Sequence, residues 1–307
     1  MNKKKILILG VTASGKGKLA FEIAKIAGGE IVSIDSMKVY RRMDIGTAKP
    51  SLENRTQIPH HLIDVVEPSE SFSVGRFIEF ADTAIKDILA RNKPVVAVGG
   101  TAMYIKALLY GLFEGAGTDE TIRDQIKARI ANEGLAVMHR ELATVDADAA
   151  HRIHANDAKR IIRAMEVYQL TGRPISSFQQ QFGSAGDVDN WVVIGLCREK
   201  TDASHRINMR VKRMIEEEFM DEVKRLLAEE RPLSQQARCA IGYAEIMDHL
   251  AGKTSIDEAI ELIKKNSRQL AKAQRTWFKT FRMVKWIDVK EDDTVEKVVP
   301  KAMAIID

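Results

Sequence analysis

Short runs of apolar, largely β-branched residues recur along the chain, separated by glycine turns and by segments of helical periodicity. The first run, KKILILG, leads through a glycine-rich stretch into KLAFEIAKIA, where Leu19, Ile23 and Ile26 recur at the spacing of one helix face. Further runs are GEIVSIDS, KPVVAVGGT, NWVVIGLC and VKWIDV. Consecutive apolar positions are typical of strands buried on both faces. Their alternation with helices predicts an α/β fold, a parallel sheet with helices on both faces.

Between residues 117 and 190 the pattern changes to helices without strands. The clearest segment is NDAKRIIRAMEVYQLTGRP, with Asn156 as its candidate N-cap and Gly172 after its last turn. It places Lys159 and Arg163 one turn apart. The polar segment QQQFGSAGDVDN predicts a linker back to the sheet. We therefore expect an α/β core of residues 1–116 and 191–307, and a helical insertion of residues 117–190 that is basic on one side.

The segment GVTASGKGK follows the first predicted strand and contains most of the phosphate-binding pattern GxxxxGK[ST]. Such a loop holds phosphates with backbone N–H groups, a helix N-terminus and a lysine, here Lys16, and it predicts a P-loop NTPase-like core. Gly17 stands where a hydroxyl normally meets the metal, which leaves Thr12 or Ser14 as a substitute ligand. The candidate phosphate-binding residues are Gly10, Thr12, Ala13, Ser14, Gly15, Lys16 and Gly17.

Asp35 and Thr101 each follow another predicted strand. Functional loops gather at the carboxyl ends of parallel strands, so we expect Lys16, Asp35 and Thr101 to converge on one crevice. Asp35 could be a general base, the acid of a second nucleotide motif or a helix cap. We interpret the adjacent His60 and His61 as structural, because neighbouring histidines rarely share one metal ion without further ligands.

The composition is that of a folded globular protein. Of 307 residues, 45% are hydrophobic and 29% are charged, which is enough for a substantial core in one or two domains. Cys197 and Cys239 are the only cysteines; they exclude a disulfide framework and a four-cysteine zinc site and fit a reducing compartment. The N-terminus shows no cleavage signal, and no apolar stretch approaches the ~20 residues that cross a bilayer. We therefore expect a cytoplasmic protein that does not bind membranes.

Basic residues are concentrated near the C-terminus, although the net charge is only +4. Residues 260–285 contain eight basic side chains and one acidic one, a local charge of +7. Six of them would form one stripe along a helix: Lys264, Arg268, Lys272, Arg275, Lys279 and Arg282. A solvated helix face is one interpretation. The other is a contact for a nucleic-acid backbone, which the scarcity of acids and the nearby Trp277 and Phe278 favour.

Several segments, in order and spacing, resemble the tRNA dimethylallyltransferases (tRNA isopentenyltransferases) over nearly the whole chain. These segments are GVTASGK, DSMKVYRRMDIGTAKP, PHHLIDVVEPSESFSV, VGGTAMYIKALL, RIHANDAKRIIRAMEVYQLTG, IGYAEI and AKAQRTWFK. The resemblance implies transfer of a dimethylallyl group to N6 of the adenosine next to the anticodon of a tRNA. It also implies that the P-loop binds the diphosphate of dimethylallyl diphosphate, that Mg²⁺ is the cofactor and that the protein is a monomer.

Residue roles follow from the same resemblance. Lys16 and the amides around Ser14 and Gly15 would bind the diphosphate, Asp35 would take or orient the proton on adenine N6, and Thr101 would hydrogen-bond near the same amine. The adenine must be flipped out of its stack to react. Residues at positions that meet the tRNA anticodon stem-loop in the family are Asp35, Ser36, Met37, Lys38, Thr101, Arg123, Lys159, Arg160, Arg163, Arg238, Lys272, Arg275 and Lys279.

The chain also departs from the family pattern. Gly17 replaces Ser or Thr, Val11 replaces Pro, Lys38 replaces Gln, Ala102 replaces Gly, and Ala273 replaces Arg. A glutamine both donates and accepts hydrogen bonds, whereas Lys38 only donates, so Lys38 bears on how the target base is recognised.

Three other functions remain open at this point. A transferase acting on free adenine nucleotides would need the same core but little RNA surface. A small-molecule kinase would use the P-loop for ATP and would normally have a hydroxyl at position 17. An RNA-binding protein with an inactive crevice would tolerate both Gly17 and Lys38.

Overall fold

The computed structural model describes residues 5–111, 117–179 and 188–307. The chain divides into two compact units, one of Met1–Leu109 with Asp187–Asp307 and the other of Tyr110–Gly186. Along the described residues, no helix has both the length and the apolar composition needed to cross a membrane.

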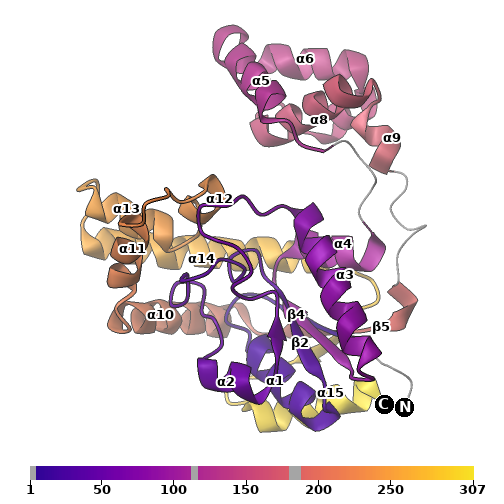
Figure 1. The fold of residues 1–307 in the computed structure, drawn as a ribbon, viewed down its shortest axis with the longest axis vertical. Coiled ribbons are helices and arrows are strands. Elements are labelled where there is room, and N and C mark those ends of the chain that lie inside the picture. Colours follow the sequence, from indigo (N-terminus) through magenta and orange to yellow (C-terminus); the bar gives the residue numbers. More distant parts are fainter. Residues whose placement is uncertain (1–4, 112–116, 180–187) are drawn as a thin grey trace. The chain divides into compact units, whose positions relative to one another are not determined.

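A six-stranded, fully parallel sheet forms the centre of the first unit (Figure 1). Its strands are β1 (Lys5–Gly10), β2 (Glu30–Ile34), β3 (His60–His61), β4 (Val95–Gly99), β5 (Trp191–Cys197) and β6 (Lys285–Asp288), in the order β3-β2-β4-β1-β5-β6. The predicted parallel sheet is confirmed. Strand β3 was not predicted, because two residues are too few to show a periodic pattern. His60 and His61 form this edge strand, and His61 Nε2 lies 2.7 Å from Glu30 Oε2.

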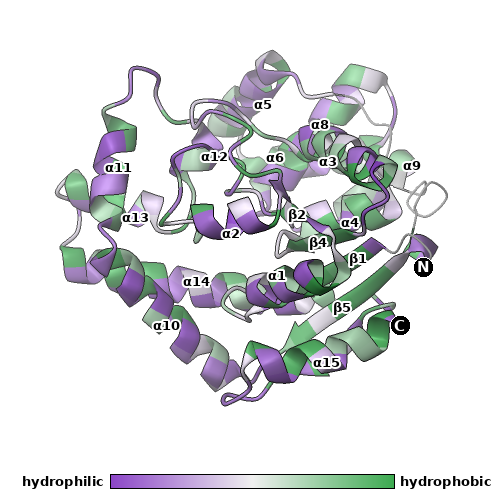
Figure 2. Cartoon of the chain, turned by 60° about the horizontal axis from the view of Figure 1, so that its bottom comes forward, coloured by the Kyte–Doolittle hydropathy of each residue, from purple (hydrophilic) through white to green (hydrophobic). Residues whose placement is uncertain are grey.

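Helices cover both faces of the sheet, as predicted. Helix α1 (Lys16–Ala27) and helix α15 (Val295–Ile306) pack on one face, where Ile6 and Ile8 of β1 join their core. Helix α3 (Val74–Ala90) packs against β2 and β4 on the opposite face. Figure 2 shows β5 as a mostly hydrophobic strand beside α15. Hydrophobic residues at successive positions of the strands thus serve two separate cores.

The remaining helices of this unit lie around the sheet. They are α2 (Leu52–Gln57), α4 (Ala102–Tyr110), α10 (Lys200–Glu216), α11 (Phe219–Leu227), α12 (Gln235–Arg238), α13 (Tyr243–Leu250) and α14 (Ile256–Phe278), with a short 3₁₀ turn at Val188–Asn190. Helix α14 is shorter than the predicted basic helix. It ends at Phe278, and Arg282 therefore lies outside it. Phe278 and Phe281 are both buried, with their rings next to each other. The chain between the end of α14 and β6 is therefore held against the core by these two rings.

The neighbouring strands β1, β4 and β2 end at the same edge of the sheet. Leu9 pairs with Gly99, and Gly99 pairs with Ile34. A Cβ atom on Gly99 would lie 2.0 Å from the Ile34 carbonyl oxygen, so only glycine allows this approach of the two strands. The three loops that carry the candidate residues therefore begin next to one another.

The second unit is entirely helical within its described residues. It consists of α5 (Glu120–Glu133), α6 (Leu135–Val145), α7 (Ala147–Arg152), α8 (Ala158–Thr171) and α9 (Ile175–Gln179) around a core of its own. The cap of α8 is Asp157, whose side chain accepts from the Arg160 amide, and not Asn156 as predicted. The carboxylate of Asp157 accepts well at this position and Asn156 lies one residue too early. Gly172 ends α8 in the left-handed conformation, as expected. Most of the predicted linker lies outside the described residues.

Candidate functional site: a phosphate-binding crevice

The loop between β1 and α1 is folded so that several of its amides remain available. Ala13 (φ 63°) and Gly15 (φ 95°) are left-handed, and the Ser14 amide donates to the Val11 carbonyl at 3.1 Å. No acceptor for the amides of Ala13, Gly15 or Lys16 occurs within the described chain. Together with the N-terminus of α1 these amides form an anion-binding concavity.

Two arginines hold this loop from helix α10 and from the residue that follows β5. Arg198 Nε donates to the Ser14 carbonyl, and Arg206 Nε donates to the Ala13 carbonyl, both at 3.0 Å. Asp202 accepts from Arg198 at 2.7 Å and fixes its position. The sequence analysis missed these residues, although arginines that recur at multiples of four residues, at positions 198, 206 and 210, were a usable signal.

Gln274 of α14 joins two loops of the crevice. Its side-chain oxygen accepts from the Thr12 amide at 2.8 Å, and its side-chain nitrogen donates to the Gly100 carbonyl at 2.9 Å. Gln274 is buried, so both bonds are shielded from water. The AKAQRTWFK segment was singled out from the sequence, but this role of its glutamine was not.

Asp35 and Thr101 lie together at the ends of β2 and β4. Asp35 Oδ1 accepts from the amides of Met37 (2.9 Å) and Lys38 (3.3 Å), and Thr101 Oγ1 accepts from the Ser36 amide at 3.1 Å. Along the described chain no hydrogen bond engages Asp35 Oδ2. The carboxylate is therefore oriented through one oxygen and has the other for a ligand. The turn from Asp35 to Lys38 is half-buried.

Three cations influence one another around Asp35. The pKa of Lys16 is lowered to about 8, chiefly by burial and next by the charge of Lys38, while Asp35 opposes the shift. Burial likewise lowers the pKa of Lys38 and of Arg210 on α10, and Asp35 again opposes. Arg210 Nε is buried without a hydrogen-bond partner. Burial and mutual repulsion destabilise the charged forms of these side chains. A bound anion would stabilise the charged forms. The expected convergence of Lys16 and Asp35 on one crevice agrees with these interactions.

The residues fit Mg²⁺ in part. Ser14 Oγ is buried without a hydrogen-bond partner, and a Cβ atom on Gly10 would lie 2.6 Å from it. Gly17 is exposed, and an added Cβ would have no neighbour within 4 Å. The described residues contain no cluster of three His, Cys, Asp or Glu side chains. Thr12 and Ser14, both buried, are the two hydroxyls of this loop that could hold a magnesium ion.

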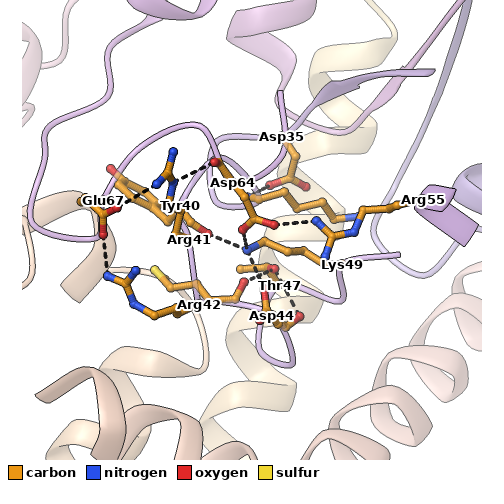
Figure 3. Close-up of polar contacts among 12 residues, drawn as sticks. Asp35, Tyr40, Arg41, Arg42, Asp44, Thr47, Lys49, Arg55, Asp64 and Glu67 are labelled. Carbon is orange, nitrogen blue, oxygen red and sulfur yellow. Dashed lines mark hydrogen bonds and ion pairs between the residues drawn. The ribbon is translucent and has the colours of Figure 1, made fainter. Parts of the chain in front are cut away.

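A network of ion pairs fixes the segment after Asp35 (Figure 3). Lys49 is almost fully buried, pairs with Asp44 and Asp64, and donates to the Tyr40 carbonyl at 2.6 Å. Arg55 pairs with the second oxygen of Asp64. These contacts make one rigid unit of the MDIGTAKP segment and the PHHLID segment.

Glu222 of α11 anchors the same segment through its carboxylate. Its buried carboxylate accepts from the amides of Asp44 (2.9 Å), Ile45 (2.7 Å) and Gly46 (3.2 Å), and from the Tyr243 hydroxyl at 2.6 Å. A Cβ atom on Gly46 would lie 2.3 Å from the Phe219 ring, so the glycine of MDIGTAKP is required by packing. Glu222 could not be identified from the sequence, because the amides that it accepts from lie 176–178 positions away in the chain.

In the helical unit, Arg123 and Arg163 both contact the fully buried Glu166. Arg123 Nε lies 3.0 Å from Oε1 and Arg163 Nη1 lies 2.7 Å from Oε2. The Asp119 amide also donates to Glu166. Lys159 and Arg160 are exposed on α8, and Arg160 pairs with Asp157. Both predicted arginines are therefore held in place while their neighbours face solvent.

The remaining predicted RNA-contacting residues belong to the first unit. Lys272 and Lys279 are exposed at α14 and its C-cap, Arg275 is half-buried, and Arg238 is exposed at the end of α12. None of these four forms an ion pair with a residue that the structure describes.

Comparison with known proteins gives consistent results. A family model described as IPP transferase matches residues 38–281. The chain is 47% identical to a tRNA dimethylallyltransferase of Geobacter metallireducens over 283 residues, which is 92% of each chain. It is 43% identical to the tRNA dimethylallyltransferase of Geobacter sulfurreducens, covering 97% of this chain and 96% of the relative.

Two solved structures have the same fold. The full-length tRNA isopentenylpyrophosphate transferase of Bacillus halodurans superposes with a TM-score of 0.71 at 38% identity, covering 99% of this chain and 97% of the other. A eukaryotic dimethylallyltransferase acting on tRNA gives a TM-score of 0.83 at 26% identity, covering 99% of this chain and 80% of that one. With a family model spanning most of its length and relatives of this identity, the chain belongs to the IPP transferase family.

Proposed function

We propose that this protein transfers a dimethylallyl group from dimethylallyl diphosphate to N6 of the adenosine next to the anticodon of a tRNA. The observation that supports this most is the juxtaposition of a phosphate-binding loop, buried cations and an oriented carboxylate in one crevice. A phosphate cradle beside a general base suits a reaction with a diphosphate leaving group and a nucleophile that must lose a proton. The relatives are named tRNA dimethylallyltransferases, which supports tRNA as the acceptor of a dimethylallyl group.

The substrate would bind with its diphosphate over the amides of Ala13, Gly15 and Lys16. Lys16 and Arg210 would neutralise its charge, which increases on the bridging oxygen as the carbon–oxygen bond breaks. The adenine N6 would attack the allylic carbon, so that a nitrogen–carbon bond forms while the carbon–oxygen bond to the diphosphate breaks. The proton lost from N6 would pass to Asp35 Oδ2, the oxygen that the turn leaves available.

Thr101 would position the amine, because its hydroxyl is already fixed by the Ser36 amide beside Asp35. Mg²⁺, when bound, would help to neutralise the diphosphate. Thr12 or Ser14 would hold it beside the diphosphate, because Mg²⁺ prefers oxygen ligands.

The tRNA would be bound through its anticodon stem-loop by one molecule of the protein, with the target base unstacked. Ser36, Met37 and Lys38 line the turn at the crevice, and the basic residues of α8, α12 and α14 would contact the phosphate backbone. Lys38 can donate to a ring nitrogen of the adenine but cannot accept from its amine.

Turnover with purified components tests the proposal. Protein, unmodified tRNA, dimethylallyl diphosphate and Mg²⁺ are incubated, and the digested nucleosides are analysed by mass spectrometry. We expect dimethylallyl-adenosine from the wild-type protein and none from Asp35→Ala, with tRNA affinity nearly unchanged in the variant. Tight tRNA binding by a wild-type protein that forms no product would contradict the proposal and indicate an RNA-binding protein.

The same assay separates the remaining alternative. A transferase for free adenine nucleotides would modify AMP, ADP or ATP in place of tRNA. Lys272 and Arg275 of α14 and Lys279 at its C-cap, which form no ion pair with a residue that the structure describes, argue for the larger substrate, since a mononucleotide could contact only a few basic residues.

A further inference from the structure

A single buried side chain links two of the loops that form the crevice. Gln274 is 8% exposed and lies on the buried stripe of α14, where its neighbours Ala271 and Phe278 are apolar. A buried carboxamide needs partners for its donor and acceptor groups. Here they come from the Thr12 amide of the phosphate loop and from the Gly100 carbonyl that follows β4. The amide at this position therefore serves the two loops and not the packing of the helix.

The amide continues the pairing of β1 with β4 beyond the ends of the two strands. Leu9 and Gly99 are the last pair of the ladder, and the two chains then separate into different loops. Gln274 Oε1 accepts from the Thr12 amide at 2.8 Å, and Nε2 donates to the Gly100 carbonyl at 2.9 Å. A carboxamide carries the same donor and acceptor as a peptide group, so it replaces one hydrogen-bonded step of the ladder. The separation of the two loops is therefore set by one side chain.

The chain leaves room for this amide at Gly100. A Cβ atom on Gly100 would lie 2.5 Å from Gln274 Nε2 and 3.6 Å from the Gly10 carbonyl oxygen. Any other residue would push the amide away from the carbonyl to which it donates, because only glycine permits so close an approach. The buried amide and the glycine against it thus form one matched contact.

The turn that begins at Gly100 holds the chain on both sides of Asp35. The amides of Gly100 and Thr101 donate to the Ile34 carbonyl at 3.3 Å and 3.4 Å. Thr101 Oγ1 accepts from the Ser36 amide at 3.1 Å. Because these bonds hold the residues before and after Asp35, a displacement of the turn displaces the carboxylate as well.

At its other end, Gln274 holds the residue that precedes the diphosphate-binding amides. Thr12 is bonded to Gln274, and the next amide, that of Ala13, is the first of those that would bind the diphosphate. The leaving group and the nucleophile are thus held by loops from different strands, with Gln274 between them. Reacting atoms must approach to ~3–3.5 Å, and a misplacement of about 1 Å lowers the rate ~10²-fold.

We propose that Gln274 is a positioning residue for the prenyl transfer, which sets the separation between the diphosphate on the phosphate loop and the amine at Asp35 and Thr101. The inference rests on the proposed function, because that function places the two substrates at these loops. Gln274 contacts neither substrate in this role and acts through Thr12 and Gly100. Its loss slows the chemical step and leaves the binding of each substrate nearly unchanged.

The test compares single-turnover rates with separately measured binding. Gln274→Met keeps the length of the side chain and removes both hydrogen-bonding groups. We expect a single-turnover rate about 10–100-fold lower, with the Kd of dimethylallyl diphosphate and the Kd of tRNA each within about threefold of wild type. A wild-type rate in this variant would overturn the proposal, and so would a rate loss that weaker binding explains completely.

Asn266→Leu is the matched control on the same helix. Asn266 Nδ2 donates to Glu245 Oε1 at 2.6 Å, about two turns of α14 before Gln274 and outside the crevice. Its replacement also removes a side-chain hydrogen bond between α14 and another helix, so the melting temperature should fall in both variants. The control should keep the wild-type single-turnover rate. An equal rate loss in it would overturn the proposal, because a loosened α14 would then be the cause.

Gln274→Glu tests the bond to Gly100 by itself. An ionised carboxylate accepts from Thr12 but cannot donate, whereas a protonated carboxyl does both. Burial raises the pKa of a carboxyl, so the ratio of the variant's single-turnover rate to that of wild type should rise as the pH falls from about 8 to about 5.5. A ratio that does not change with pH would overturn the proposal. A wild-type protein without turnover would contradict the proposed function and this inference together, whereas normal wild-type turnover beside an unaffected Gln274→Met would overturn the inference alone.

Discussion

Glu222 offers a quantitative test of how the crevice is supported. Its carboxylate is buried (4% exposed) and accepts four hydrogen bonds, from the amides of Asp44, Ile45 and Gly46 and from the Tyr243 hydroxyl. In Glu222→Gln the amide can keep its oxygen toward Asp44 and Ile45. Its NH₂ group then faces the Gly46 amide, another donor, while the Tyr243 hydroxyl can rotate to accept.

The expected cost combines one unsatisfied buried amide, about 1–3 kcal/mol, with the loss of charge assistance in the other bonds. A total of about 2–4 kcal/mol corresponds to a melting temperature about 5–10 °C lower for a unit of this size. Thermal unfolding of Glu222→Gln measures it, and Glu217→Gln, an exposed glutamate on the preceding turn, should stay within about 0.5 kcal/mol of wild type. A melting temperature equal to wild type in Glu222→Gln would refute the role assigned to this carboxylate.

Three further predictions concern the crevice itself. Lys16 loses its charge as the pH rises through about 8, so the affinity for dimethylallyl diphosphate should fall as the pH rises through this value. Lys16→Arg keeps its charge and should show no such fall. Calorimetric titration from pH 7 to 9.5 measures both profiles, and a flat wild-type profile contradicts the prediction. Lys38→Gln removes a charge that lowers the pKa of Lys16, so the fall should move to higher pH in the same titration; an unmoved midpoint would mean the two ammonium groups do not interact. Gly17→Thr adds a hydroxyl in open space and should lower the Mg²⁺ concentration for half-maximal turnover, whereas an unchanged requirement would place position 17 away from the metal.

The sheet was predictable because its strands show their burial directly in the sequence. Five runs of apolar residues correspond to five of the strands, and the glycine loop indicated where phosphate chemistry belongs. The edge strand at His60 and His61 has no such pattern. The observed N-cap of α8, Asp157, lies one residue after the predicted one, because Asn156 and Asp157 are both favourable N-cap residues and the sequence does not distinguish them.

The supporting contacts of the crevice were not predictable in the same way. Gln274 reaches Thr12 across 262 positions, and Arg206 reaches Ala13 across 193. The spacing of the arginines at 198, 206 and 210 indicates a shared helix face, but nothing in the sequence shows which distant loop carbonyl an arginine or Gln274 will contact.

The central claim is that the phosphate loop holds the leaving diphosphate of a prenyl donor and not ATP. The most direct test gives the protein unmodified tRNA with either dimethylallyl diphosphate or ATP and quantifies diphosphate, inorganic phosphate and modified nucleoside together. The account predicts equal amounts of released diphosphate and dimethylallyl-adenosine from the prenyl donor, abolished in Lys16→Ala, and no consumption of ATP. ATP turnover without a modified nucleoside would contradict it and make the crevice that of a kinase.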